Sequence, residues 1–103
     1  MTEARRLKLH EILCEILGSR RVYFQPPEST KMEYDAIRYS RSKVQKISAD
    51  NTAYLKTTRY EVIHIYRDPD NELINEILKL PMSSHDNHYV ADNLHHDVYS
   101  IYF

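Results

Sequence analysis

The chain has 103 residues, of which 42% are hydrophobic and 28% are charged, and it contains a single glycine. This length excludes a two-domain enzyme because so few side chains fill one hydrophobic core, and the composition excludes a disordered tail. The formal net charge is −1, so a uniformly basic surface for nucleic acid is not expected. We therefore expect one compact domain over residues 1–103.

The charges are unevenly distributed along the chain. Residues 1–67 contain thirteen Lys or Arg and eight Asp or Glu, whereas residues 68–103 contain only Lys79 against seven acids. The two parts therefore have formal charges of +5 and −6. A molecule with two opposite faces of this kind can attract further copies of itself, and a head-to-tail contact between different patches can close into a ring.

The first element predicted is an amphipathic helix at about residues 3–17. Apolar residues from Leu7 to Leu17 recur mostly at spacings of three and four, and Gly18 follows where helices commonly need a left-handed residue. Acidic residues interrupt this apolar pattern, so we expect neither a signal peptide nor a membrane span in this segment. Residues 21–27 then form a short extended edge segment that ends at two prolines.

The middle of the chain predicts a long hairpin. One strand, with an irregular second half, is expected from Ala36 to about Ile47. Another strand, which is richer in Thr, Tyr, Val and Ile, is expected from Thr57 to Arg67. The small and Asx residues at 48–52 are typical of a loop tip. A short helix with apolar residues from Leu73 to Leu80 follows.

Two further strands are expected at about residues 87–91 and 96–103, separated by a turn at Asp92-Asn93. The order of elements is helix, strands, helix, strands. This order predicts an α+β domain with a mainly antiparallel sheet, flanked by an N-terminal helix and a second short helix.

Histidines near the C-terminus raise the possibility of a metal site. His85, His88 and His96 would be its ligands, with His95 close in sequence. Adjacent residues of a strand point to opposite faces, however, so His95 and His96 cannot both face one ion. We interpret this segment as a solvated, His-rich hairpin and expect no metal or other cofactor; a small His-dependent metal-binding protein is the alternative.

Other chemistry-bearing residues favour structural roles. Cys14 lies on the apolar stripe of the first helix, where a buried thiol is inert. Asp68 and Asp70 flank Pro69 at a strand-to-helix turn, where either can cap the helix. One glycine is too few for the known phosphate-binding loops. We therefore expect no enzymatic activity.

Three motifs together resemble a known family. They are Val22-Tyr23-Phe24-Gln25-Pro26-Pro27, Arg67-Asp68-Pro69-Asp70, and the ending Asp92-Asn93-Leu94-His95-His96-Asp97 followed by Val98-Tyr99-Ser100-Ile101-Tyr102-Phe103. Their order and spacing resemble the tail terminator proteins, also called tail completion or tail-to-head joining proteins, of long-tailed bacteriophages. The resemblance runs from about residue 7 to the C-terminus, although His95 stands where we would expect asparagine.

The resemblance implies an α+β fold and a virion structural protein of the phage tail or neck, assembled in the host cytoplasm and not bound to a membrane. In that family six copies form a ring that caps the tail tube, ends its polymerisation and receives the filled head. The implied partners are further copies of the chain in a homo-hexameric ring, the major tail tube protein and head-completion or neck proteins, with DNA passing through the lumen without sequence-specific binding.

The candidate residues for a subunit or tube interface combine the basic hairpin, its tip and the acidic turn that follows. They are Lys43, Lys46, Asp50, Asn51, Tyr54, Arg59, Arg67, Asp68 and Asp70. The alternative function within the same particle is a head-closure or neck adaptor protein, which would also be small, β-rich and oligomeric.

Overall fold

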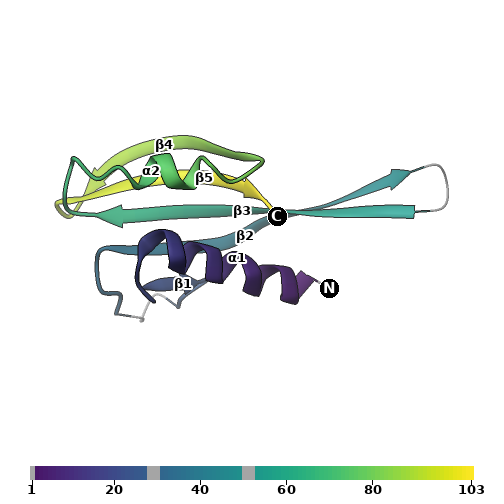
Figure 1. Ribbon diagram of the computed structural model, residues 1–103, viewed down its shortest axis with the longest axis horizontal. Coiled ribbons are helices and arrows are strands. Elements are labelled where there is room, and N and C mark those ends of the chain that lie inside the picture. Colours follow the sequence, from purple (N-terminus) through teal and green to yellow (C-terminus); the bar gives the residue numbers. More distant parts are fainter. Residues whose placement is uncertain (1, 28–30, 50–52) are drawn as a thin grey trace.

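The computed structural model describes residues 2–27, 31–49 and 53–103. It confirms the α+β class. Figure 1 shows helix α1 (Thr2–Leu17) and, in chain order after it, β1 (Val22–Phe24), β2 (Ala36–Ala49), β3 (Ala53–Tyr66), helix α2 (Leu73–Ile77), β4 (Ser83–Ala91) and β5 (Leu94–Tyr102). The described strands form a single sheet in the order β1-β2-β3-β5-β4.

Helix α1 begins and ends close to the predicted positions. Its inner side contributes Leu9, Leu13 and Cys14 to the core. Leu7, which belongs to the same apolar pattern, is instead 50% exposed, so its assignment to the buried stripe is wrong. The helix ends at Gly18, whose φ of +74° is the left-handed conformation that glycine adopts at least cost, and the N–H groups of Gly18 and Ser19 both donate to the Cys14 carbonyl.

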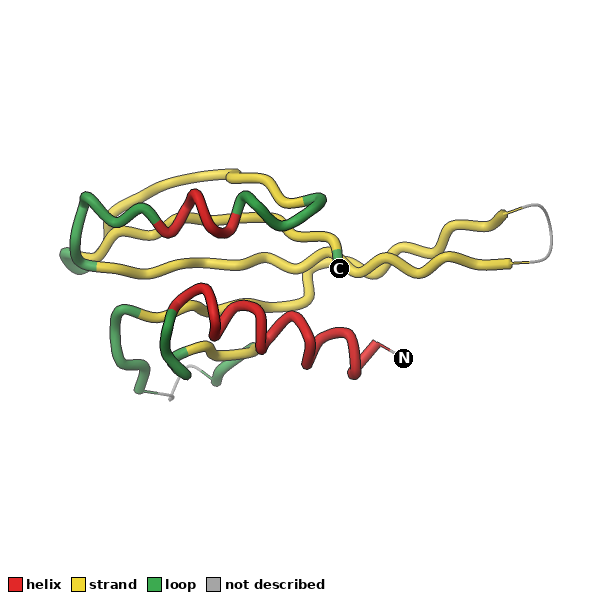
Figure 2. The backbone as a smooth tube through the Cα atoms, in the orientation of Figure 1, coloured by secondary structure: helices red, strands yellow, loops and turns green. Residues whose placement is uncertain are grey.

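Both helices pack on the same face of the sheet. Figures 1 and 2 show α1 in front of β1 and β2, and α2 in front of β4 and β5. Tyrosines from three neighbouring strands, Tyr39, Tyr60 and Tyr99, lie beneath them and are almost fully buried. The core is completed by aliphatic residues of both helices and four strands, namely Leu9, Leu13, Val22, Ile37, Val62, Ile77 and Ile101.

Strand β1 confirms the predicted edge segment and adds one feature. It pairs with β2 in parallel, from Val22 opposite Ile37 to Phe24 opposite Tyr39, whereas every other strand pairing among the described residues is antiparallel. Pro26 and Pro27 follow at once. Since proline has no N–H to donate, the parallel pairing stays short.

The β2–β3 hairpin extends past the ends of the other strands of the sheet. Both strands have 14 residues, from Ala36 opposite Ile65 to Ala49 opposite Ala53, with a register shift between Arg41 and Lys43 that matches the predicted irregularity. Strand β5 reaches only as far as Tyr102, opposite Arg59. The rest of the hairpin therefore extends beyond the sheet as two strands, as Figure 1 shows.

Strands β4 and β5 form a second hairpin around the predicted turn. Asp92 and Asn93 have φ values of +53° and +63°. Two consecutive positive values are typical of the type I′ turn that suits the twist of paired strands, and asparagine tolerates them well. Strand β4 begins at Ser83, four residues before the predicted start. The prediction placed the start too late because the first residues of β4 are polar and exposed and show no hydrophobic alternation.

The prediction that Asp68 or Asp70 caps the second helix is wrong. Helix α2 is preceded by Glu72, which makes no capping bond, and the Leu73 N–H donates to Oδ1 of Asn71 at 2.9 Å. Asp68 instead accepts the Asp70 N–H at 3.0 Å and so shapes the preceding turn. Asn71 satisfies a backbone donor next to the first turn of α2, which is the role that capping side chains fill.

Two leucines of α1 test how the helix is held. Leu13→Ala should lower the free energy of unfolding by about 2–5 kcal/mol because it removes a fully buried side chain and leaves a cavity. Leu7→Ala, the matched control on the same helix, should change it by less than about 0.5 kcal/mol because Leu7 is half exposed. Urea denaturation measures both values, and equal losses would contradict this packing.

Candidate functional site

The interface candidates occupy opposite ends of β3. Lys43, Lys46, Tyr54 and Arg59 lie on the extended part of the β2–β3 hairpin or at its base, whereas Arg67, Asp68 and Asp70 follow the far end of β3. Asp50 and Asn51 lie outside the described residues. A 14-residue strand spans about 45 Å, so the structure does not bring the seven described candidates together into one surface.

The first of these two groups belongs to a projecting ribbon. We call residues 43–49 of β2 and 53–57 of β3 the β-arm. Within the described residues the pairing of the β-arm is between its own two strands, and the register places Lys43 opposite Arg59 and Lys46 opposite Lys56. At about 3.3 Å per residue, the seven residues 43–49 extend about 23 Å. The β-arm is thus a basic two-stranded extension with an open backbone edge on each side.

Arg59 has a structural role at the base of the β-arm. Its Nη2 and Nε donate to the Ser100 hydroxyl at 2.8 and 3.1 Å, and Nη2 lies 3.7 Å from a carboxylate oxygen of Asp86. The Ser100 hydroxyl in turn donates to Asp86. Arg59 therefore connects β3, β5 and β4, which the sequence alone did not indicate.

The second group forms a turn with few side-chain bonds. Arg67 donates its backbone N–H to Oδ1 of Asp35 at 3.1 Å, and Arg67, Asp68 and Asp70 are all exposed. The Asp68 carboxylate bonds the Asp70 N–H. Arg67 and Asp68 also border an open pocket of about 500 Å³ together with Asp35. The exposed carboxylates of Asp68 and Asp70 can meet a basic partner.

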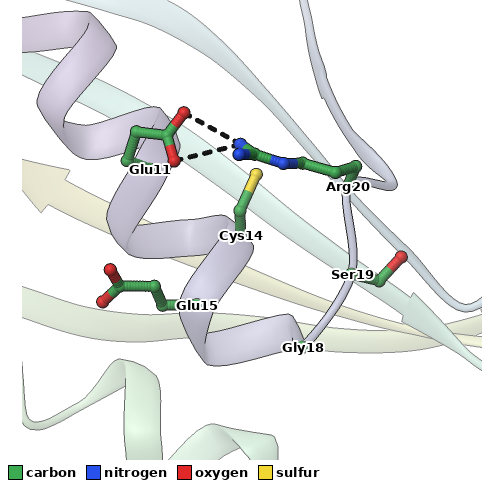
Figure 3. Close-up of a pocket in the computed structure, with 6 residues that line it drawn as sticks. All are labelled: Glu11, Cys14, Glu15, Gly18, Ser19 and Arg20. Carbon is green, nitrogen blue, oxygen red and sulfur yellow. Dashed lines mark hydrogen bonds and ion pairs between the residues drawn. The ribbon is translucent and has the colours of Figure 1, made fainter.

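Cys14 lines a shallow pocket at the end of α1, drawn in Figure 3. The pocket has a volume of about 390 Å³ and is bordered by Glu11, Glu15, Gly18, Ser19 and Arg20 as well. Arg20 donates to both carboxylate oxygens of Glu11, at 2.8 and 3.0 Å. Cys14 itself is 7% exposed and belongs to the core cluster, which agrees with a packing role for the thiol.

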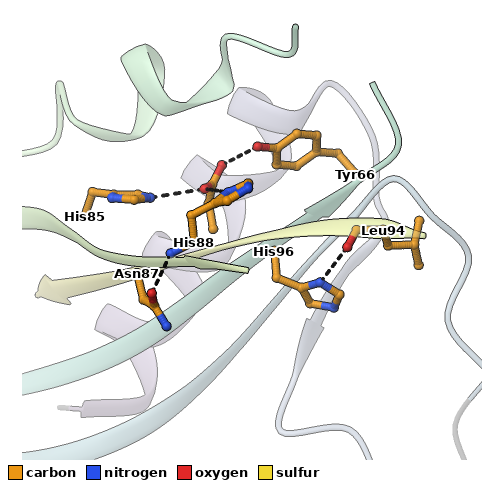
Figure 4. Close-up of polar contacts among 7 residues, drawn as sticks. Tyr66, His85, Asn87, His88, Leu94 and His96 are labelled. Carbon is orange, nitrogen blue, oxygen red and sulfur yellow. Dashed lines mark hydrogen bonds and ion pairs between the residues drawn. The ribbon is translucent and has the colours of Figure 1, made fainter. Parts of the chain in front are cut away.

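Three side chains donate to the carboxylate of Asp97, on the helix-covered face of the sheet. His85 Nε2 and His88 Nδ1 lie 3.1 and 2.7 Å from Oδ1, and the Tyr66 hydroxyl donates to Oδ2 at 2.7 Å. Figure 4 shows the two imidazoles and the phenol converging from β4 and β3. The Asp97 side chain is only 9% exposed, so these bonds replace the water that it loses.

A register shift allows both histidines to reach one carboxylate. Residues three apart in a regular strand face opposite sides, but the pairing of β4 with β5 shifts between His85 and Asn87. His85 and His88 are thereby placed on one face, while Asp86 bonds Ser100 and Arg59 on the other. The bulge is the feature that sequence periodicity did not reveal.

His96 lies on the other face of the sheet. Its Nδ1 is 3.0 Å from the Leu94 carbonyl oxygen, and its ring stacks on Tyr89 with centroids 4.6 Å apart. The ligand set His85, His88 and His96 of the metal hypothesis is therefore not assembled. Among the residues that the structure describes, no group of three His, Cys, Asp or Glu is arranged to hold a metal ion.

The surroundings of Asp97 shift several pKa values. Burial by itself raises the pKa of Asp97, but hydrogen bonds from Tyr66, His88 and His85 hold it below its ordinary value. Burial, reinforced by the bond to Asp97, raises the pKa of Tyr66 to about 12. Burial also lowers the pKa of His64 to about 4, although the Asp97 charge opposes this shift. Asp97 is thus ionised and His64 neutral near pH 7.

The sequence places Asp97 close to the histidines, but it did not indicate that Asp97 bonds His85 and His88 or that Tyr66 joins them. The available signal was an acid directly after His95-His96, on a strand that could pair with the preceding one. What could not be read was the register that places Asp97 opposite both His64 and His88.

Comparisons with known proteins add no relationship. No protein-family model matches the chain, and no curated protein or solved structure shows significant similarity to it. Neither α1 nor α2, the helices in the described part of the chain, is long and apolar enough to cross a membrane.

The buried His64 predicts acid sensitivity. The unfolded chain takes up a proton at this residue below pH 6.5, whereas the folded chain resists it until about pH 4, so stability is lost as the pH falls between these values. Wild type should lose about 2 kcal/mol more than His64→Leu between pH 7.5 and pH 5. Urea denaturation at the two pH values measures this; parallel losses would contradict it.

Proposed function

We propose that this chain is a tail terminator protein, a virion structural protein that forms a ring on the end of a phage tail tube and joins the tail to the head. Two independent features support the proposal. The motifs described above resemble those of that family in order and spacing, and the fold provides a projecting element suited to assembly. The β-arm is the observation that carries the proposal furthest.

The β-arm has the properties of an assembly element. An isolated two-stranded ribbon is only marginally stable in water, and its open edges are suited to pairing with another chain. Within the described residues, nothing in this chain pairs with those outer edges. A neighbouring subunit or the rim of the tube would supply the missing partner by strand addition or side-by-side packing.

The uneven charge of the chain favours a contact between two different patches, one basic and one acidic. Lys43, Lys46 and Lys56 of the β-arm belong to residues 1–67, whose formal charge is +5, while α2, β4 and β5 belong to residues 68–103, whose formal charge is −6. A contact between the β-arm of one copy and the acidic part of the next would join two different patches. Such heterologous contacts generate a ring when the rotation closes.

Termination then follows from the two unlike faces of the ring. One face would continue the contacts that stack successive rings of the tube. The other would lack the surface that a further tube ring requires, so growth would stop through loss of complementarity. This second face would be available to the head-side neck proteins, and no reaction is required.

The direct test is the mass of the protein in solution, by light scattering, alone and with assembled tail tubes, followed by electron microscopy of the tube ends. Ring-sized particles, or caps at one end of the tubes, are the expected result. A protein that ignores tubes and binds the portal end of filled heads would overturn the proposal in favour of a head-closure or neck adaptor.

Reversing the charge of the β-arm should weaken assembly. We expect Lys43→Glu/Lys46→Glu to reduce the fraction of capped tubes by at least about tenfold, with a larger effect at low salt where screening is weaker. Arg59 is left unchanged because it bonds Ser100 inside the domain.

The matched control for this variant is Arg5→Glu/Lys8→Glu. It makes the same change in charge at two exposed positions of α1 and should cap tubes normally. If both double variants lose capping equally, net charge is responsible and the β-arm has no special role.

A further inference from the structure

His64 is a buried histidine with an unsatisfied nitrogen. It is 1% exposed, and its Nε2 has no hydrogen-bond partner within the described residues. Its ring stacks on Tyr66 with centroids 4.6 Å apart, and the register places it opposite Ile37 on one side and Asp97 on the other. A proton added to this ring would create a cation that the surrounding chain shields from bulk solvent.

Few groups lie close enough to stabilise a positive charge on His64. Two carboxylates influence His64: Asp97 of β5, and Asp35 just before β2, which already accepts the Arg67 N–H. Tyr66 of β3 is a hydrogen-bond donor to Asp97, and His85 and His88 of β4 contact the same carboxylate. The helix acids Glu11, Glu15, Glu72 and Glu76 are all exposed. Asp97 is therefore the carboxylate best placed to respond.

We propose that protonation of His64 draws the carboxylate of Asp97 away from His85 and His88 and thereby releases strand β4 from the edge of the sheet in acid. His85 and His88 can give up this bond because their side chains are 29% and 42% exposed and water can solvate them. His64 has no such alternative. The inference is independent of the proposed ring.

Strand β4 is the element that should respond. It is an edge strand whose described pairing is with β5 alone, and its residues from Ser84 to Val90 are exposed. Two polar links join its side chains to the sheet: the histidines on Asp97, and Asp86 on Ser100 and Arg59. Loss of the first link leaves the strand held by backbone bonds, by the partly exposed Asp86 cluster and by the stacking of Tyr89 on His96.

The test is hydrogen exchange of backbone amides at pH 7.5 and pH 4, with rates corrected for the intrinsic effect of pH. In wild type, protection of residues 83–91 should fall by about tenfold or more at pH 4, where folded His64 takes up its proton, beyond any fall in the paired centre of β2 and β3. His64→Leu should abolish this difference because it removes the titrating ring.

The matched control is His96→Gln, which removes a histidine from the other face of the same hairpin and should respond to acid as wild type does. Asp97→Asn provides a second variant if His64→Leu does not fold: it should leave β4 weakly protected at both pH values. Acid release that persists in His64→Leu, or uniform loss of protection across all strands of wild type, would overturn the proposal.

Discussion

The unequal lengths of the strands are the constraint on which the rest of the structure depends. The hairpin of β2 and β3 has 14 residues in each strand, but β5 pairs with β3 only from Arg59 to Tyr66 and β1 covers only three residues of β2. The domain can therefore bury only one end of this hairpin beneath its helices. The other end must remain a two-stranded ribbon or find a partner in another chain.

Within the domain, the helices cover one face of the sheet, and this face changes character along the strands. Tyr39, Tyr60 and Tyr99 fill its centre with Leu9 and Leu13 of α1. Towards the far end of β3 the buried residues become polar, and a single ionised carboxylate, Asp97, satisfies donors from two neighbouring strands. The β-arm and the polar network thus lie at opposite ends of β3.

Much of the fold could be predicted because it follows from local signals. The spacing of apolar residues located α1, Gly18 located its end, and Asp92-Asn93 located the tight turn, since each depends on nearby backbone geometry. The exposed position of Leu7 and the parallel pairing of β1 depend on how elements meet and could not be predicted. The same reason explains the site: the bulge that aligns His85 with His88, and the register that places Asp97 between strands, are properties of pairing. The role of Arg59 inside the domain was hidden in the same way.

The most direct test of the account is to shorten the β-arm. Replacing residues 46–56 by a two-residue turn would join Gln45 to Thr57, which are already cross-strand partners. Electron microscopy of tail tubes mixed with this variant, together with its urea unfolding curve, would separate assembly from folding. The shortened domain should keep nearly unchanged stability and should no longer cap tubes. A shortened protein that still caps them would contradict the central claim that the β-arm carries assembly.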